Sequence, residues 1–296
     1  NLEIVRNEKI IALPFYIPLI TNLINRIFRL PLLNIFCLAN ITILKKINQN
    51  FSDKKDNKVS FIIPCKNEQN NIKEFEKLIR ENNYTNEYLF GDDNSSDNTS
   101  HEIDNLRYKL SDYKIIKYDG PGVCKSDNVY KGIEYATGDI IIIYDADLTV
   151  SVQDIEFSIH ILKNTNADFI NCTRMIYPQK DGAMKFFNFI GNNFFAGLFS
   201  LLFKKKITDT LCGTKIFYKK DWMKIKKNNS KWGVKDLWGD FDLLIGAYKN
   251  NLKITEVPVT YYERKAEETK MTSVISNAIR MLLIVLSAYY KLRLMK

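Results

Sequence analysis

One stretch constrains the fold more than any other: four consecutive isoleucines, Ile140–Ile143, are followed by Tyr144, Asp145, Ala146 and Asp147. Such a β-branched run favours a strand that is buried on both faces of a parallel sheet, where apolar and polar residues need not alternate. The ligand crevice of such sheets lies beyond the carboxyl ends of the strands. We therefore expect both aspartates to enter that crevice. There they can bind one hard divalent cation, although an acidic turn after a core strand would explain the same residues.

Composition sets the class of protein but not the partner. The 296 residues are 46% hydrophobic and 26% charged, which fits a folded α/β unit with appendages. A net charge of +9 favours anionic partners such as nucleotides, lipid headgroups or nucleic acid. Five scattered cysteines without a C-x-x-C pair indicate reduced thiols and argue against a structural zinc site. The first residue is Asn and no leader pattern follows, so we expect a fragment or a processed form.

Strands and helices alternate along the central part of the chain. The expected strands span residues 59–64, 87–90, 113–118, 140–144 and 168–172. The expected helices span residues 70–83, 101–110, 126–136 and 152–164. Beyond them the pattern predicts a helix over 182–203, a loop and strand over 209–217, a helix over 238–248 and a strand over 252–263. This spacing indicates βαβ units, so the sequence predicts an α/β fold with a mostly parallel sheet flanked by helices.

The two ends of the chain differ from this pattern. Residues 1–57 form an apolar segment, read as short helices with an apolar face, that ends in a polar linker. Residues 58–272 are the predicted central domain, and residues 273–296 a basic amphipathic helix. The apolar core of that helix, 281–286, is too short to cross a bilayer, and no apolar run reaches about 18 residues, so no transmembrane helix is expected.

The predicted helix over 182–203 is unusually aromatic and is followed at once by Lys204, Lys205 and Lys206. A membrane-surface helix with a basic flank would show this pattern. An ordinary core helix followed by a solvated lysine run would show it too. The sequence leaves both interpretations open.

Three blocks in a fixed order carry a family resemblance: V-S-F-I-I-P-C-K-N-E, D-D-N-S-S-D-N-T and G-D-I-I-I-I-Y-D-A-D. Together they resemble the nucleotide-sugar half of family 2 glycosyltransferases of the GT-A fold, the dolichol-phosphate-mannose synthase group among them. The later blocks C-T-R, D-T-L-C-G-T-K-I-F, W-G-D-F-D-L-L and E-V-P-V-T-Y-Y-E-R-K-A-E-E-T-K are similar to the acceptor side of that group. The resemblance covers roughly residues 58–293.

A narrower resemblance concerns R-M-I-Y-P, A-M-K-F-F-N, G-N-N-F-F and D-T-L-C-G-T-K. These blocks look like a bacterial subgroup in which the glycosyltransferase domain follows a methyltransferase-like domain in one chain. It implies that the apolar N-terminal segment is the tail of such a preceding domain. Helices lying in a membrane interface are the alternative for the same segment.

The family resemblance also assigns the nucleotide-sugar donor site. The base and ribose fall to six residues: Pro64, Lys66, Asn67, Glu68, Asp92 and Asp93. Lys125 and Asp145 complete the donor site, although Cys124-Lys125-Ser126 replaces the Gly-Lys-Gly that the family often has. Carboxylates suit this role because they accept hydrogen bonds from base N–H groups and ribose hydroxyls.

The same resemblance implies a metal site and a phosphate site. Asp145 and Asp147 would hold Mg²⁺ or Mn²⁺ against the diphosphate, where the cation neutralises charge on the leaving group. Arg174, Arg264 and Lys270 match the family's basic positions near phosphates.

These assignments predict a function. The leading hypothesis is an inverting, metal-dependent transfer of a sugar from a nucleotide-diphospho-sugar to a membrane-associated acceptor, a polyprenyl phosphate. The alternative acceptor is a sugar hydroxyl in cell-surface polysaccharide synthesis. That reaction needs a base, for which Asp240 and Asp242 are the candidates, whereas a capped helix start is their structural explanation.

Two other classes fit less well. A nucleotidyltransferase needs a Gly-rich loop with Arg and Pro-Lys after the first strand, which Pro64-Cys65-Lys66-Asn67 does not supply. A non-catalytic binding module would favour membrane over nucleic acid, because the basic residues cluster beside aromatic helices. We therefore expect a cytoplasmic protein, peripheral on the inner face of the membrane, that does not bind nucleic acid.

Overall fold

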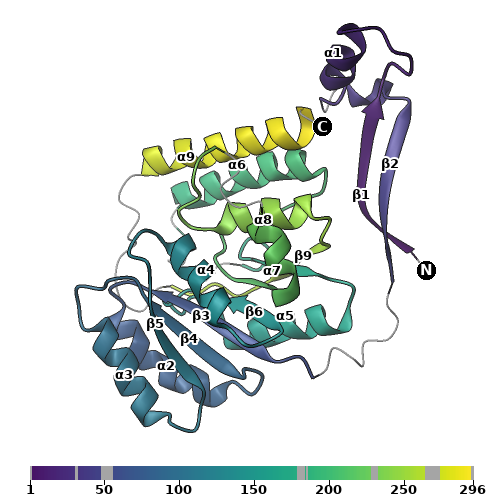
Figure 1. Ribbon diagram of the computed structural model, residues 1–296. Helices are drawn as coiled ribbons and strands as arrows, with labels where there is room; N and C mark the ends of the chain where they lie inside the picture. The colour runs from purple at the N-terminus through teal and green to yellow at the C-terminus, as the bar shows by residue number, and fades with distance from the viewer. Residues whose placement is uncertain are drawn as a thin grey trace.

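The computed structural model describes residues 2–30, 33–47, 56–178, 184, 186–227, 233–263 and 274–294. A seven-stranded sheet of order β5-β4-β3-β6-β8-β7-β9 forms its centre (Figure 1). The strands are β3 (Val59–Cys65), β4 (Glu87–Asp92), β5 (Ile115–Asp119), β6 (Ile140–Ile143), β7 (Phe169–Thr173), β8 (Lys215–Tyr218) and β9 (Ile254–Pro258). Neighbouring strands run parallel except β8, which is antiparallel to β6 and β7. The predicted α/β fold with a mostly parallel sheet is confirmed.

The isoleucine run forms β6 in the middle of this sheet, with all four side chains buried. Ile140 and Ile142 face one apolar layer, while Ile141 and Ile143 face the other. Each strand residue points opposite to its neighbours, so a strand covered on both sides needs apolar residues at every position. This burial explains why the run shows no alternation.

Helices cover both faces of the sheet (Figure 1). One layer contains α2 (Gln69–Glu81), α3 (Thr99–Lys109) and α5 (Val152–Asn164). The other contains α4 (Lys125–Tyr135), α6 (Phe186–Phe203), α7 (Lys219–Lys226), α8 (Asp240–Lys249) and α9 (Val274–Tyr289). The two layers follow from the alternation of buried strand residues between the faces.

A buried carboxylate fixes the amino end of the sheet, opposite to the end where the site lies. Glu87 of β4 accepts hydrogen bonds from Ser60 Oγ (2.6 Å) and Thr137 Oγ1 (2.8 Å), and it pairs with Lys114 (2.5 Å). Burial opposes its charge, but Lys114, Ser60 and Thr137 outweigh burial and lower the pKa of Glu87 from 4.5 to about 2. Glu87 therefore ties β3, β4 and the start of β6 together.

The prediction of short helices near the N-terminus is right for one helix and wrong for the residues on either side of it. β1 (Leu2–Ile11) and β2 (Ala39–Lys46) form an antiparallel hairpin, and the described residues between them contain α1 (Ile20–Ile27) and one 3₁₀ turn, Asn34–Phe36. Proline and arginine interruptions suggested helix breaks, but β-branched residues in both strands favour extended backbone. The pairing joins residues far apart in sequence, which a local pattern does not reveal.

One C-terminal helix bears on the prediction that the chain has no transmembrane helix. Residues Ile275–Arg293 form one helix whose length and composition would allow it to span a bilayer, and about 28% of its apolar window is buried in the protein. Asn277 and Arg280 interrupt the apolar run in the sequence of this helix. A helix tolerates such scattered polar residues, so run length underestimated its apolar character.

Candidate active site

The predicted donor residues gather where β3 and β4 end at the carboxyl edge of the sheet. They are Pro64, Lys66, Asn67, Glu68, Asp92 and Asp93. Asp93 is buried, and its Oδ1 accepts the backbone N–H of Gly122 at 2.7 Å. Its Oδ2 lies 3.8 Å from Lys66 Nζ, and Lys66 itself is exposed. Two parallel strands thus bring the carboxylates and the lysine of distant motifs together.

The loops that follow β3 and β4 hold each other. Asn67, at a left-handed φ of 52°, donates its backbone N–H to Ser95 Oγ at 2.9 Å. Ser95 Oγ donates to Asp92 Oδ1 at 2.5 Å, and the backbone N–H of Glu68 donates to Thr99 Oγ1 at 2.7 Å. Short hydroxyl side chains therefore fix the backbone of the residues that are predicted to bind the nucleotide.

Asp145 and Asp147 leave β6 on an irregular turn at the same edge. Asp145 Oδ1 pairs with Lys125 Nζ, the first residue of α4, at 2.5 Å. Burial alone would lower the pKa of Lys125, but Asp145 and Asp240 outweigh burial and raise it. Leu148 adopts φ 56°, an uncommon conformation for a bulky residue that is often found near functional sites.

The donor atoms of this turn suit a divalent cation. Asp145 and Asp147 offer hard carboxylate oxygens, and Asp147 Oδ1 is oriented by the hydroxyl of Thr149 at 2.8 Å. Among the described residues no group of three or more His, Cys, Asp or Glu side chains forms a ready metal cage. Mg²⁺ commonly takes one or two carboxylates and completes its shell with water and substrate phosphates, so the pair fits that mode of binding.

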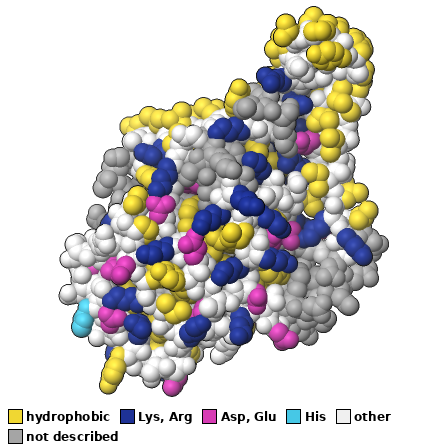
Figure 2. Space-filling view, viewed as in Figure 1, with side chains coloured by type: hydrophobic (Ala, Val, Ile, Leu, Met, Phe, Trp, Pro, Cys, Tyr) yellow, Lys and Arg dark blue, Asp and Glu magenta, His cyan; other side chains and the backbone are white. Residues whose placement is uncertain are grey.

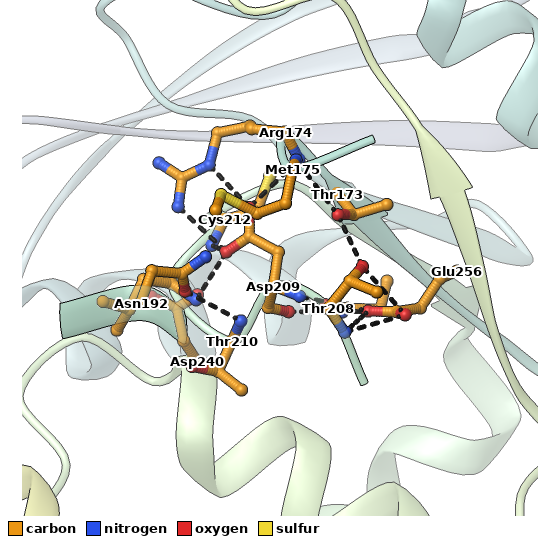
Figure 3. A network of polar contacts seen from close by, with 12 residues as sticks. Thr173, Arg174, Met175, Asn192, Thr208, Asp209, Thr210, Cys212, Asp240 and Glu256 are labelled. Atoms are coloured by element: carbon orange, nitrogen blue, oxygen red, sulfur yellow. Dashed lines mark hydrogen bonds and ion pairs between the residues drawn. The ribbon is translucent and has the colours of Figure 1, made fainter. Parts of the chain in front are cut away.

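Residues 207–214 form the loop between α6 and β8, which lies beside Arg174 (Figure 3). Asp209 within it is fully buried and holds Arg174 through two bonds, Nε to Oδ2 at 2.8 Å and Nη2 to Oδ1 at 3.0 Å. Burial opposes the charge of Asp209, but Arg174 outweighs it and lowers the pKa of that carboxyl. Asp209 Oδ1 also accepts the backbone N–H of Cys212 at 3.0 Å. Arg174 is thus fixed by the loop.

Three side chains from neighbouring strands hold the backbone of this loop, and we call them the polar row: Asn171 and Lys215, which are buried, and Glu256, which is half-buried. They are cross-strand partners on β7, β8 and β9 and so lie on one face of the sheet. Glu256 accepts the backbone N–H of Thr208 at 2.9 Å, and Asn171 donates to the carbonyl of Asp209 at 2.7 Å. Lys215 Nζ, with no exposed surface, donates to the loop carbonyl at position 212.

Sequence reasoning missed the role of the polar row. The signal was one charged or amide side chain in each of three strands, F-I-N-C-T, K-I-F-Y and I-T-E-V-P. A Lys or Asn inside a core strand must find hydrogen-bond partners, so such a residue predicts a buried polar contact. The sequence pattern does not reveal which loop supplies the partners.

The loop meets the carboxylate turn at Gly213. A Cβ atom at this position would collide with the carboxylate of Asp145 and lie 2.8 Å from Lys125 Nζ. The absence of a side chain therefore lets the loop backbone approach both residues. Asp145, Lys125 and Gly213 form the junction between the two halves of the site.

The structure separates the two candidate bases at the start of α8. Asp240 lies 3.7 Å from Lys215 Nζ, and burial raises the pKa of Asp240 to about 6 although Lys215 and Lys125 oppose the rise. Burial raises the pKa of the Tyr130 hydroxyl, and Asp242 is the charged group that adds most to this rise. Asp240 is consequently the residue that shares the electrostatic environment of Lys125 and Asp145.

The start of α8 packs against the start of α4. Asp236 caps α8 by accepting the backbone N–H groups of Phe241 (2.8 Å) and Asp242 (3.0 Å). Ser126, where the family often has glycine, is buried and donates its hydroxyl to the carbonyl of Asp236 at 2.8 Å. The serine thus adds a bond between the two helices and leaves Lys125 at the junction.

Two predicted phosphate-binding residues, Arg264 and Lys270, lie outside the described residues. Arg174, the third, directly follows β7, and its backbone N–H donates to Asp209 Oδ2 at 3.0 Å.

A mostly parallel α/β sheet whose central strand ends in a D-x-D turn at the carboxyl edge agrees with a nucleotide-diphospho-sugar transferase of the GT-A fold. The family model for glycosyl transferase family 2 matches residues 60–227, and the chain belongs to that family.

Relatives and solved structures agree with this assignment. The dolichyl-phosphate beta-glucosyltransferases ALG5D and ALG5C of Trichomonas vaginalis are 27% and 24% identical to the chain. The matches cover 82% and 74% of this chain, and 76% and 68% of the relatives. Glucosyl-3-phosphoglycerate synthase from Mycobacterium tuberculosis, solved with Mn²⁺, UDP and glucosyl-3-phosphoglycerate, superposes with a TM-score of 0.58 at 12% identity, covering 82% of this chain and 85% of that one. The structural likeness shows the fold.

Proposed function

We propose that the protein transfers a sugar, with inversion, from a nucleotide-diphospho-sugar to a polyprenyl phosphate in a divalent-metal-dependent reaction. The observation that carries the proposal is the junction at which Gly213 of the acceptor-side loop lies against Asp145 and Lys125 of the donor side. The names of the similar Trichomonas proteins, dolichyl-phosphate glucosyltransferases, support a lipid phosphate as acceptor.

In this proposal one set of residues binds the base and ribose of the donor, and a second set stabilises the diphosphate leaving group. Asp93, Lys66 and the loop at Asn67 would bind the base and ribose. Asp145 and Asp147 would hold Mg²⁺ or Mn²⁺, which neutralises charge on the departing nucleoside diphosphate. The mycobacterial fold neighbour was solved with Mn²⁺ and UDP, which supports the use of a divalent cation and a nucleotide-sugar. Lys125 adds a positive charge beside the same phosphates.

The acceptor needs little chemical activation in this proposal. A phosphate monoester is ionised at neutral pH, so it attacks without a strong general base. Arg174, held by Asp209 with its guanidinium 5.1 Å from the ring of Tyr261, can grip an acceptor phosphate. The protein's contribution would be to align acceptor and donor and to stabilise charge.

A donor screen tests the proposal. Purified protein is incubated with Mn²⁺, a polyprenyl phosphate and a panel of UDP- and GDP-sugars, and the organic phase is analysed for glycolipid. We expect one glycolipid, together with release of nucleoside diphosphate, and neither in EDTA. If no donor in the panel gives a glycolipid, the polyprenyl-phosphate assignment is wrong, and release of pyrophosphate would indicate a nucleotidyltransferase.

The position of Asp240 favours one second candidate, transfer to a sugar hydroxyl. A carboxyl with a pKa of about 6 beside Lys125 is suited to accept a proton near neutral pH. The substitution Asp240→Asn distinguishes the two acceptors, with Asp242→Asn as the matched control. A loss of about a hundredfold or more in turnover with unchanged nucleotide affinity supports the hydroxyl acceptor. Turnover within about tenfold supports the phosphate acceptor, which needs no base.

We also propose a cytoplasmic location, peripheral on the inner face of the membrane. Supporting side chains are exposed on α6 and α9, among them Phe187, Ile190, Phe194, Ile279 and Leu283. Flotation with anionic liposomes tests this location, and a protein that stays in the soluble fraction would contradict it. The domain boundaries at 57/58 and 272/273 and the fused methyltransferase-like domain stay predictions.

A further inference from the structure

The described residues between β1 and β2, 12–30 and 33–38, expose many apolar side chains, and we call this segment the apolar tip. Two of its polar side chains bond to its own backbone: Asn25 Oδ1 accepts the backbone N–H of Ala12 at 2.9 Å, and Thr21 Oγ1 accepts that of Ile17 at 2.7 Å. Thr21 is buried, although it lies in a short helix at the end of a hairpin. Internal satisfaction of backbone groups is what an apolar solvent demands.

The large apolar side chains of the apolar tip turn outward. Leu19 is 86% exposed and Leu23 is 60% exposed. Others that share this exposure are Phe15, Tyr16, Ile35 and Phe36. Soluble surfaces seldom carry so large a contiguous apolar patch, which marks an interaction site.

Charge around the apolar tip has one sign. From residue 9 to residue 52 the chain has no Asp or Glu. Its charged residues there are Lys9, Arg26, Arg29, Lys45 and Lys46. Basic residues flanking an apolar segment attract anionic lipid headgroups, whereas a protein partner of ordinary composition imposes no such bias.

A buried ionic cluster fixes the hairpin beside the end of α9. Glu8 of β1 accepts Arg293 Nη1 at 2.7 Å and Arg6 Nε at 2.6 Å, and Arg293 Nη2 donates to the hydroxyl of Tyr248 at 2.8 Å. Arg29 of the apolar tip donates to the carbonyl of Arg293 at 3.5 Å. The apolar tip therefore has a defined position relative to the glycosyltransferase domain.

The apolar tip and α9 lie on the same side of the molecule, away from α2 and α3 (Figure 1). Figure 2 shows hydrophobic side chains over the apolar tip and along the edge formed by α9. On α9 these include Ile279, Leu283 and Leu286, each about half exposed. The apolar tip and the outer face of α9 thus both expose apolar side chains on this side of the molecule.

We propose that the apolar tip inserts into the acyl layer of a bilayer containing anionic lipid, while the outer face of α9 rests on the same bilayer. The tip would be an anchor that the N-terminal hairpin adds to the glycosyltransferase domain. This inference does not depend on which acceptor or donor the enzyme uses. A second copy of the chain or a neighbouring domain could cover the same surface, and the experiment separates these occupants.

The test measures co-sedimentation with vesicles of phosphatidylcholine alone and of phosphatidylcholine mixed with phosphatidylglycerol. The double variant Leu19→Glu/Leu23→Glu removes two outward side chains, and Tyr108→Glu on α3, at a residue 88% exposed, is the matched control. We expect the double variant to partition at least about tenfold more weakly into the mixed vesicles, and the control within about twofold of the unaltered protein. UDP affinity should be equal in all three, which shows that folding and the donor site are intact.

A second measurement reports insertion directly. The variant Tyr16→Trp places an indole on the apolar tip, and its emission should shift to shorter wavelength with mixed vesicles and be quenched by lipids brominated in the acyl chain. Equal partitioning of the double variant and the control, or an indole that bromolipids do not quench, would overturn the proposal. An oligomer that the double variant dissociates, without any vesicle binding, would also overturn it in favour of a second copy.

Discussion

The two halves of the sheet hold their functional loops by different means. In the donor half, β3 to β6, short side chains of adjacent loops such as Ser95 and Thr99 bond directly to the backbone that follows the strands. In the proposed acceptor half, β7 to β9, the polar row on three strands holds one loop. Local turns thus preform the proposed donor site, whereas the proposed acceptor-side loop depends on side chains of the sheet.

Substitutions in the carboxylate turn, Asp145–Asp147, should reduce activity most, because the two halves of the sheet meet there. The substitution Asp147→Asn keeps the shape of the side chain and removes the charge that a cation requires. We expect sugar transfer to fall by about a thousandfold or more, since stabilisation of the leaving group is lost. Product formation with saturating Mn²⁺ checks this. The exposed Asp112→Asn serves as control, and a variant of Asp147 that retains a tenth of the activity would refute a metal role.

The second largest effect should come from the polar row. Lys215→Met preserves length while removing the hydrogen bond to the loop and the charge 3.7 Å from Asp240. We expect turnover to fall by roughly tenfold to a hundredfold, because loop and carboxylate lose their alignment. Since Lys215 lowers the pKa of Asp240 against the effect of burial, any acidic limb that Asp240 causes in the pH profile should move to higher pH.

Steady-state kinetics across pH measures both consequences of Lys215→Met. The exposed Lys220→Met, five residues later, is the control for loss of a lysine on the same part of the chain. Turnover within about twofold of the unaltered protein at every pH would mean that the polar row is structural only.

The smallest effect should appear away from the site, at the amino end of the donor half. Glu87→Gln should lower the free energy of unfolding at pH 7 by about 2 kcal/mol, without changing turnover. The pKa of Glu87 is about 2 in the folded protein against 4.5 as the ordinary value, so its contribution is present above about pH 4.5 and is lost as pH falls toward 2.

Urea titrations at pH 7 and at pH 3 measure the effect of Glu87→Gln, with the exposed Glu81→Gln as control. The difference between the Glu87 variant and the unaltered protein should shrink at the lower pH. A difference that is equal at both values would show that the buried carboxylate is not charged in the folded state.

The sequence allowed the donor half to be predicted because its information is local. The run Ile140–Ile143 specifies a strand buried on both faces, and the acidic turn follows within four residues. Likewise, Asp92 is the last residue of β4 and Asp93 directly follows it. Since parallel strands align their carboxyl ends, the order of these motifs was enough to bring them to one edge.

The polar row, the N-terminal hairpin and the position of Asp240 depend on contacts between distant segments of the chain. Lys215 and Asn171 are cross-strand neighbours only because β8 enters the sheet antiparallel between β6 and β7. The hairpin joins Leu2 to Lys46, and neither strand shows the clean alternation that identifies a half-buried strand. Asp240 and Asp242 are both in the first turn of α8, and only packing reveals that Asp240 faces Lys215. Register and packing, which local patterns do not encode, decided these features.

The most direct test of the account concerns Gly213, where the acceptor-side loop touches the donor site. Calorimetric titration of UDP, with Mn²⁺ and with EDTA, is carried out on the unaltered protein and on Gly213→Ala. We expect Mn²⁺ to increase the affinity of the unaltered protein for UDP. The methyl group added by Gly213→Ala would collide with Asp145, so we expect it to remove most of this increase in affinity. Equal Mn²⁺-dependent binding by both proteins would contradict the claim that the two halves meet at the metal-binding carboxylate.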